Sequence, residues 1–340
     1  MAGRPPAPRG ARRPDMSQPS TQRGPILPVL ATALTAKLGL WLALIAWSRS
    51  RVNHNVPLTA ALRGELVRFC GRRAGNLAYY VAGPSQGNHS PLILLHSINA
   101  SGSSFEMKPL FEHYAQTRRV VALDLPGFGF SDRSDRLYRP ALFRDAILDL
   151  IEQELAGTRV DAVALSLSSE FLALAARCKP AYFRSLSFLS ATGFSRRNLG
   201  LRPNYLLWRL LRVPLWRRAV YDLLTSRPSL RFFLRSNQRT RLNQALVDYA
   251  YLTSHQPQAE YAPLAFISFL LFTPGIFAVY RDLPQPCLAI FGEDAFSRYD
   301  LASELCNRPN WRVVLLKQAG ALVHWDAPRA VMVALDAQLS

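Results

Sequence analysis

The segment DLPGFGFSD, residues 124–132, decides the fold of this 340-residue chain. It follows RVVALD at residues 119–124, a short apolar run with the β-branched side chains typical of a buried strand. Pro126, Gly127 and Gly129 then favour a tight turn, because proline fixes its own φ and glycine adopts a positive φ without strain. We therefore predict a strand that runs directly into a sharply turned loop.

Five more apolar runs alternate with helical patterns along the chain. They are PLILLHS (91–97), RVDAVALS (159–166), RSLSFLS (184–190), PCLAIFG (286–292) and WRVVLLK (311–317). Two β-rich runs at 65–70 and 77–82 predict a leading hairpin, and helices are expected around 299–306 and 327–338. Continuous apolar runs separated by helices are typical of strands buried on both faces of a parallel sheet. The fold class is therefore α/β, with a mostly parallel central sheet flanked by helices.

The chain divides into a core and three other parts. Residues 1–25 are rich in Pro, Arg, Gly and Ser, which predicts a disordered basic tail. Residues 26–48 are mostly apolar and, at about 1.5 Å per residue, long enough to cross a hydrocarbon core of about 30 Å. We interpret them as a membrane-spanning or membrane-surface helix, with a cleaved presequence as the third alternative. The core is assigned to residues 60–194 and 283–340, and the Arg-rich segment 195–282 to a helical cap.

Four strand ends together resemble those of the α/β-hydrolase superfamily, over residues 65–338. The segment at 124–132 is similar to the D-x-P-G-x-G-x-S loop of many capped hydrolases, which identifies the fold but not the activity. His96-Ser97-Ile98-Asn99 resembles the His-Gly loop whose backbone N–H groups help to build an oxyanion hole, with Ser97 in place of the usual glycine. The resemblance implies that the amide of Ile98 or Asn99 is one oxyanion donor.

The third strand end, Ala164 to Ser169, lies where the family has G-x-S-x-G-G. This nucleophile elbow needs small neighbours, because its serine occupies a strained turn against closely packed chains. Ala164 and Ser168 are small enough. The resemblance implies that Ser166 is the nucleophile and that the amide of Leu167 is the other oxyanion donor.

The fourth strand end supplies the candidate for the orienting acid. Gly292-Glu293-Asp294-Ala295 lies where the family usually has G-x-x-D, so Ala295 occupies the expected carboxylate position. A shift of one residue is absorbed more easily in a loop than in a strand. Asp294 is therefore the best candidate.

The last loop departs from the family pattern G-H-x-x-H-x-E-x-P. The sequence is GALVHWDAP at residues 320–328, so Ala321 replaces the catalytic histidine and His324 holds the place of the second, supporting one. Because a triad depends on geometry more than on sequence register, His324 is the candidate general base, and the chain order Ser166, Asp294, His324 matches the superfamily. The alternative is a histidine that bonds locally and caps the last helix. His255 is a remote second candidate.

Two segments of the cap add a narrower resemblance. TSRPSLRFFL (225–234) and YAYLTSHQP (249–257), with a last loop that carries one histidine, resemble a subgroup of bacterial, cyanobacterial or plastid hydrolase-like proteins. In such a subgroup the degenerate triad is a shared trait.

Composition restricts the partners. The net charge is +18, and residues 195–245 hold twelve arginines against one acidic residue, Asp222. With aromatic and aliphatic neighbours at helical spacing, these arginines suit an anionic membrane surface, whereas nucleic-acid binding finds no recognised motif. The four cysteines and six histidines are scattered, which argues against a metal site, and the glycine-rich stretches fit no nucleotide cofactor.

The leading functional hypothesis is a membrane-associated serine hydrolase that cleaves an ester or related acyl bond of a hydrophobic or lipid-like small molecule. Ser166 is its nucleophile, His324 its base and Asp294 its orienting acid, without cofactor or metal. The alternative is a non-catalytic protein of the same fold that binds a lipid or a protein partner, which the lost elbow glycines and Ala321 favour.

Overall fold

The computed structural model describes residues 1–3, 26–85, 89–196, 201–293 and 299–340. The chain divides into two compact units, Met1–Ala43 and Leu44–Ser340. The sheet and the candidate site lie in the second unit. The predicted disordered tail falls almost entirely on residues 4–25, which lie outside the described residues.

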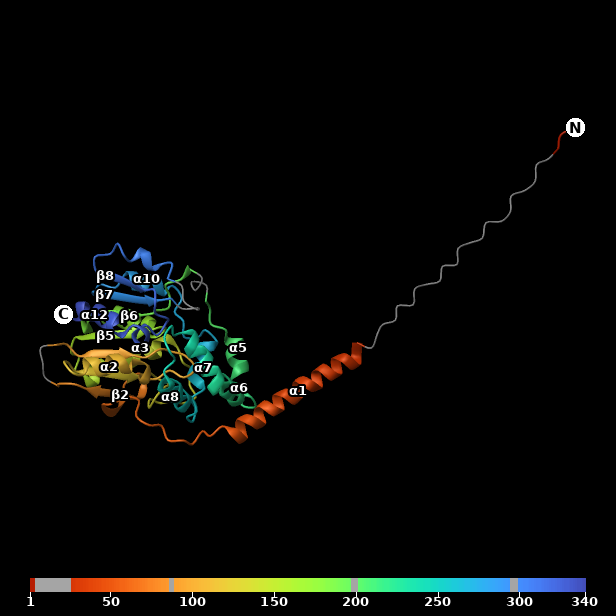
Figure 1. The fold of residues 1–340 in the computed structure, drawn as a ribbon, viewed down its shortest axis with the longest axis horizontal. Helices are drawn as coiled ribbons and strands as arrows, with labels where there is room; N and C mark the ends of the chain where they lie inside the picture. The colour runs from red at the N-terminus through yellow and green to blue at the C-terminus, as the bar shows by residue number, and fades with distance from the viewer. Residues whose placement is uncertain (4–25, 86–88, 197–200, 294–298) are drawn as a thin grey trace. The chain divides into compact units, whose positions relative to one another are not determined.

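One eight-stranded sheet forms the centre of the second unit (Figure 1). Its strand order is β1-β2-β4-β3-β5-β6-β7-β8. Strands β1 and β2 form the predicted antiparallel hairpin, β2 pairs antiparallel with β4, and the other neighbours are parallel. The strands are β1 (Glu65–Gly71), β2 (Gly75–Ala82), β3 (Leu92–Leu95), β4 (Val120–Asp124), β5 (Val160–Leu165), β6 (Phe183–Leu189), β7 (Cys287–Gly292) and β8 (Trp311–Leu316). The predicted α/β fold with a mostly parallel sheet is confirmed.

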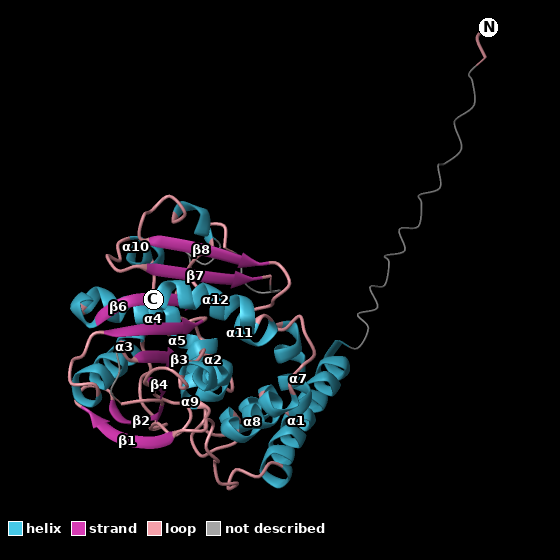
Figure 2. Ribbon diagram, turned by 60° about the vertical axis from the view of Figure 1, so that its left-hand side comes forward, coloured by secondary structure: helices cyan, strands magenta, loops and turns pink. Residues whose placement is uncertain are grey.

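Helices cover both faces of the sheet because alternate strand residues point to opposite sides. On β3, Ile93 and Leu95 join the core under α3 (Pro140–Asp149), α4 (Ser168–Cys178) and α10 (Ile276–Arg281). Leu92 and Leu94 join the opposite core. Helices α2 (Lys108–Tyr114), α11 (Val323–Asp326) and α12 (Pro328–Leu339) cover that face of the sheet (Figure 2). The short helical turns are η1 (Ser104–Met107), η2 (Leu150–Glu154), η3 (Pro180–Tyr182) and η5 (Ala302–Glu304). The helix expected around 299–306 was wrong in extent, since only the turn η5 forms there.

The loop after β4 has the sharp turn that its sequence predicts. Gly127 and Gly129 have φ of 90° and 53°. A Cβ on Gly129 would overlap the Asp124 carboxyl group, so this position requires glycine. That carboxylate accepts hydrogen bonds from Phe130 N at 2.9 Å and Ser104 N at 3.1 Å. The motif therefore ties the end of β4 to η1, at the edge of the sheet where the candidate site lies.

A helical insertion, residues 195–282, separates β6 from β7. Its helices before α10 are α5 (Tyr205–Leu211), α6 (Arg217–Leu224), α7 (Arg227–Ser236), α8 (Gln244–Ser254) and α9 (Tyr261–Ile267). The insertion thus has the helical content expected of residues 195–282. The division of the chain into tail, anchor, core and cap stays a prediction.

Residues Ile26–Arg51 form helix α1. Of the helices in the described ranges, none combines the length and the apolar character that spanning a membrane requires. The membrane role predicted for residues 26–48 remains untested.

Candidate active site

Ser166 occupies the sharp turn between β5 and α4 and has a φ of 55°. Non-glycine residues seldom adopt this left-handed conformation, which costs about 1–3 kcal/mol. The turn is held by the hydrogen bond from Ser166 N to Leu189 O, 2.8 Å, and by that from Ser169 N to Ser166 O, 3.1 Å. Ala164 and Ser168 beside it are fully buried, which explains why only small residues fit. The geometry is that of the predicted elbow, and the role of nucleophile stays a prediction.

The predicted oxyanion donors flank this turn. The loop after β3 carries Ile98 and Asn99, which line the same cavity as Ser166, and Leu167 is the first residue after the elbow serine. The backbone amides of Ile98, Asn99 and Leu167 donate no hydrogen bond to any described residue. Amides left free in this way can stabilise the charge that develops on a carbonyl oxygen during attack by the serine.

His96 fixes the position of this loop and takes no part in the cavity lining. Its Nδ1 donates to Ser97 O at 2.7 Å, and its Nε2 accepts a hydrogen bond from Leu125 N at 3.0 Å. Burial lowers the pKa of His96, so the ring is neutral and bridges the loop after β3 to the loop after β4.

His324 is fully buried, and its Nε2 donates to the main-chain oxygen of Glu106 at 2.7 Å. The Trp325 indole Nε1 donates to the same oxygen, also at 2.7 Å. His324 Nδ1 is buried without a hydrogen-bond partner among the described residues. Burial lowers the pKa of His324 to about 4. The expected hydrogen bond between His324 and Ser166 is not formed in this structure, because the ring is turned onto the main chain; its role as general base stays a prediction.

Ala321, in the position of the family histidine, does line the cavity with Ser166. The loop that carries it is held by Asp326, whose carboxylate accepts hydrogen bonds from Gly320 N at 2.8 Å, Arg239 N at 2.9 Å and Thr240 N at 3.1 Å. The loop is thereby attached to the segment that follows α7. The position from which the family's base acts thus carries only a methyl group.

The remaining candidates do not complete a triad in the described structure. Asp294, the predicted orienting acid, lies outside the described residues. His255 is buried, donates Nδ1 to Tyr251 O at 2.7 Å and stacks on His54, away from the residues that line the cavity. In the described ranges, no group of three or more His, Cys, Asp or Glu side chains could hold a metal ion.

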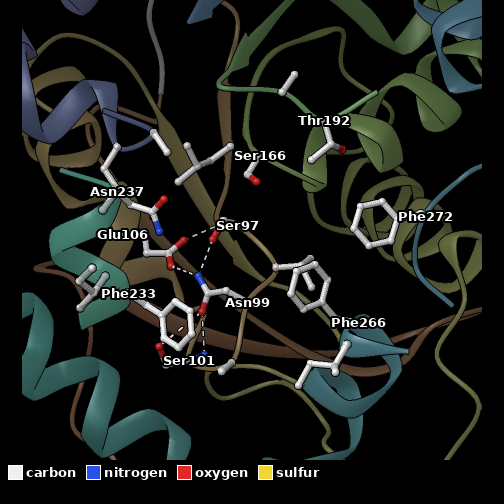
Figure 3. A pocket seen from close by; sticks show the side chains of 18 of the residues that line it. Ser97, Asn99, Ser101, Glu106, Ser166, Thr192, Phe233, Asn237, Phe266 and Phe272 are labelled. Atoms are coloured by element: carbon white, nitrogen blue, oxygen red, sulfur yellow. Dashed lines mark hydrogen bonds between the residues drawn. The ribbon is translucent and has the colours of Figure 1, made fainter. Parts of the chain in front are cut away.

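Sequence reasoning missed Glu106, a residue of η1 whose side chain lines the cavity. Its Oε2 accepts a hydrogen bond from Ser97 N at 2.8 Å, and its Oε1 accepts one from Asn99 Nδ2 at 2.7 Å (Figure 3). Only 4% of the residue is exposed, and burial raises the pKa of Glu106 to about 7. A glutamate within the otherwise small and apolar segment SSFEM, where the chain returns to the core, was the available signal.

The cavity between the sheet edge and the insertion has a volume of about 570 Å³. One end is polar and carries Ser97, Asn99, Glu106 and Ser166 (Figure 3). The other walls are apolar side chains from α6, α7, α9 and the loop after α9, namely Leu224, Leu230, Phe233, Leu234, Phe266, Ile267, Phe269 and Phe272. A cavity of this shape suits a molecule with a long apolar part and one polar group.

Comparison with known proteins identifies the family and the fold to which this site belongs. A model of the alpha/beta hydrolase family matches residues 92–335. A search of curated proteins finds no significant match. Similar solved structures include a probable hydrolytic enzyme from Pseudomonas aeruginosa, with 16% identity, a TM-score of 0.67 and coverage of 84% of this chain and 97% of that one. A carboxylesterase from Bacillus subtilis has 17% identity and a TM-score of 0.63, over 88% of this chain and 96% of that one. A thermophilic esterase from Thermogutta terrifontis has 15% identity and a TM-score of 0.63, over 80% of this chain and 97% of that one. These likenesses show the fold.

Proposed function

Because the chain belongs to the alpha/beta hydrolase family, we propose that it is a serine hydrolase that cleaves an ester or related acyl bond of a hydrophobic molecule. One observation carries the proposal: Ser166 lines a largely apolar cavity from a strained turn with a φ of 55°. Backbone strain of this kind persists where the surrounding fold enforces it, and it gathers at functional sites. Two of the similar structures are esterases by name, which supports the choice of an acyl bond.

In the proposed reaction, Ser166 Oγ attacks the acyl carbon and its proton passes to a base. The amides of Ile98 and Leu167 stabilise the oxyanion, and the proton then leaves with the alcohol as an acyl-enzyme forms. Water hydrolyses this intermediate by the same route in reverse. As the base, His324 must exchange its bond to Glu106 O for one to Ser166, and Asp294 must orient it.

The apolar walls supply the substrate preference. Phe233 on α7 and Phe269 after α9 line the cavity and are also 45% and 37% exposed, so they stand at its mouth. A molecule that enters between them contacts apolar side chains before it reaches Ser166. A hydrophobic or lipid-like substrate fits this path.

Membrane association is the second part of the proposal, and the outer face of the insertion supports it. Large apolar side chains there are between 45% and 79% exposed: Tyr205, Leu206, Leu210, Leu223, Phe232 and Phe233. Exposed arginines lie among them, including Arg209, Arg231 and Arg235. An apolar face interleaved with arginines suits the interface of an anionic bilayer, which would place the cavity mouth at the lipid.

A second candidate function is a non-catalytic protein that binds a lipid in the same cavity. Two residues favour it. Ala321 has no side-chain base to offer Ser166, and His324 donates its hydrogen bond to the main-chain oxygen of Glu106. A ligand-binding protein needs the cavity but not the proton acceptor.

Labelling of the full chain with a fluorophosphonate separates these two functions. The hydrolase predicts labelling of the wild type, loss of labelling in Ser166→Ala and in His324→Ala, and full labelling in Ser236→Ala, a partly exposed serine on α7. Circular dichroism and thermal unfolding of each variant show that loss of label is not loss of fold. An unlabelled wild type refutes the hydrolase and leaves the binding protein.

A further inference from the structure

Glu106 is the one ionisable side chain among the residues that line the cavity, within the part of the chain that the structure describes. All other polar groups of the lining are neutral hydroxyls and amides, such as those of Ser97, Asn99 and Asn237. The described lining therefore holds a single charge, and that charge is negative when the carboxyl group is ionised.

No cation of the described residues neutralises the carboxyl group. Its hydrogen-bond partners are Ser97, through its amide and its hydroxyl, and the Asn99 side chain, and no ion pair of the described residues includes it. Lys108, two residues along, lies over the Phe105 ring and faces Glu112. His324 reaches the main chain of Glu106 and is neutral, because burial lowers its pKa to about 4.

The carboxylate keeps a free acceptor site. The Ser97 amide, the Ser97 hydroxyl and the Asn99 side chain supply three hydrogen bonds, whereas a carboxylate has room for about four. The group can thus accept a further hydrogen bond from a molecule in the cavity. A second carboxylate in the same water-poor space would be repelled.

We propose that Glu106 selects the polar group of the ligand: the cavity takes amphiphiles whose head is a hydroxyl or an amine and rejects those that end in a carboxylate. The inference rests on the proposed function only in taking this cavity as the substrate site. For a hydrolase it means that neutral or cationic esters are bound and that a free fatty acid, as product, is expelled.

The size of the discrimination follows from the protonation of Glu106. Burial raises its pKa to about 7, so an anionic ligand can enter once the group takes up a proton. The pH of 8 is one unit above this pKa, so protonating Glu106 there lowers the affinity for an anionic ligand about tenfold. At pH 6 the group is already protonated, and the penalty is lost.

The test is the binding of octanol, octylamine and octanoate, three probes with one chain length, to the full-length Ser166→Ala protein by calorimetry. At pH 8 octanoate is expected to bind about tenfold more weakly than octanol, and at pH 6 the two are expected to bind equally. Glu106→Gln should remove the difference at pH 8. Glu170→Gln is the matched control, since it alters another buried carboxyl group, which accepts hydrogen bonds from Thr192 and Thr273 and does not line this cavity.

Octanoate that binds as well as octanol at pH 8, or an unchanged ratio in Glu106→Gln, overturns the inference. A protein that binds none of the three probes overturns it as well. If Glu106→Gln does not fold, the change between pH 6 and pH 8 in the Ser166→Ala protein decides alone. Fluorophosphonate labelling tests Ser166 separately. Selective binding of the probes by a protein that is not labelled refutes the hydrolase but supports the role of Glu106 in selecting the polar group.

Discussion

His324 Nε2 lies 2.7 Å from the main-chain oxygen of Glu106, and this hydrogen bond fixes which end of each residue faces the cavity. A carbonyl oxygen only accepts, so Nε2 carries the proton and His324 is held in the core. Glu106, pinned through its backbone, directs its carboxyl group into the cavity instead. The titratable group beside the elbow serine is thus an acid, whereas the family pattern places a histidine there.

Restoring the family's histidine should therefore activate Ser166. Ala321 lines the cavity with Ser166, and Asp326 holds the surrounding loop in place. In Ala321→His/His324→Ala, compared with His324→Ala alone, we expect fluorophosphonate labelling to accelerate about 100-fold, since a positioned general base contributes that much or more. The measurement is the second-order rate of labelling at pH 8.

Ala321→Asn, also combined with His324→Ala, is the control, because asparagine has a similar polar bulk but cannot take up the proton. Equal labelling rates for the histidine and asparagine variants would contradict the prediction. They would show that the loop does not present position 321 to Ser166.

The sequence was enough to predict the sheet because its signals are local. Each apolar run is itself a strand: residues 159–166 were predicted and Val160–Leu165 are observed, and residues 311–317 correspond to Trp311–Leu316. The elbow at Ser166 was predictable for the same reason, since small residues between a strand and a helix are visible in order along the chain.

The fate of the last loop could not be predicted, because distant residues decide it. Asp326 is held by Arg239 and Thr240, more than 80 positions earlier, and His324 by the oxygen of Glu106, 218 positions earlier. A main-chain oxygen is present at every residue, so no residue type marks such a partner. Glu106 was missed for this reason: its importance comes from where the loop after β3 returns.

The opposed pKa shifts of Glu106 and His324 predict a change in stability with pH. Glu106 has a pKa of about 7 in the folded state against its ordinary value of 4.5, so the folded state binds more protons between these values. Stability therefore falls as pH rises from about 4.5 to 7, by roughly 3 kcal/mol from this group. His324 has a folded pKa of about 4 against 6.5, so it makes stability rise between pH 4 and 6.5 by a similar amount.

Glu106→Gln should gain stability relative to the wild type as pH rises from 5 to 7, and His324→Ala should lose it. Urea unfolding at both pH values measures this difference, and a constant offset of each variant does not affect it. If the difference in unfolding free energy between variant and wild type is the same at pH 5 and pH 7, the assigned pKa shifts are refuted.

The buried carboxylate of Asp161 predicts a stability effect far from the cavity. It pairs with Arg118, which is 4% exposed in its side chain, and with Arg184 at 2.8 Å. Asp161→Asn leaves Arg118 buried without its partner charge, which costs about 3–5 kcal/mol. Urea unfolding should show this loss, whereas Asp145→Asn, at a more exposed pair with Arg144, should change stability by less than about 1 kcal/mol.

The outer face of the insertion predicts binding to anionic vesicles. Arg231 and Arg235 are exposed on α7 beside Phe232, and neither forms an ion pair within the described ranges. An arginine near an anionic surface contributes about 1 kcal/mol, so Arg231→Ala/Arg235→Ala should weaken binding roughly 30-fold. Flotation with vesicles of phosphatidylglycerol and phosphatidylcholine measures this, and added salt should weaken the wild type in the same direction. The matched control is Arg312→Ala/Arg329→Ala, which removes the same charge from exposed positions on β8 and α12. If both double variants lose binding equally, net charge alone is responsible and the face formed by α5, α6 and α7 is not the membrane surface.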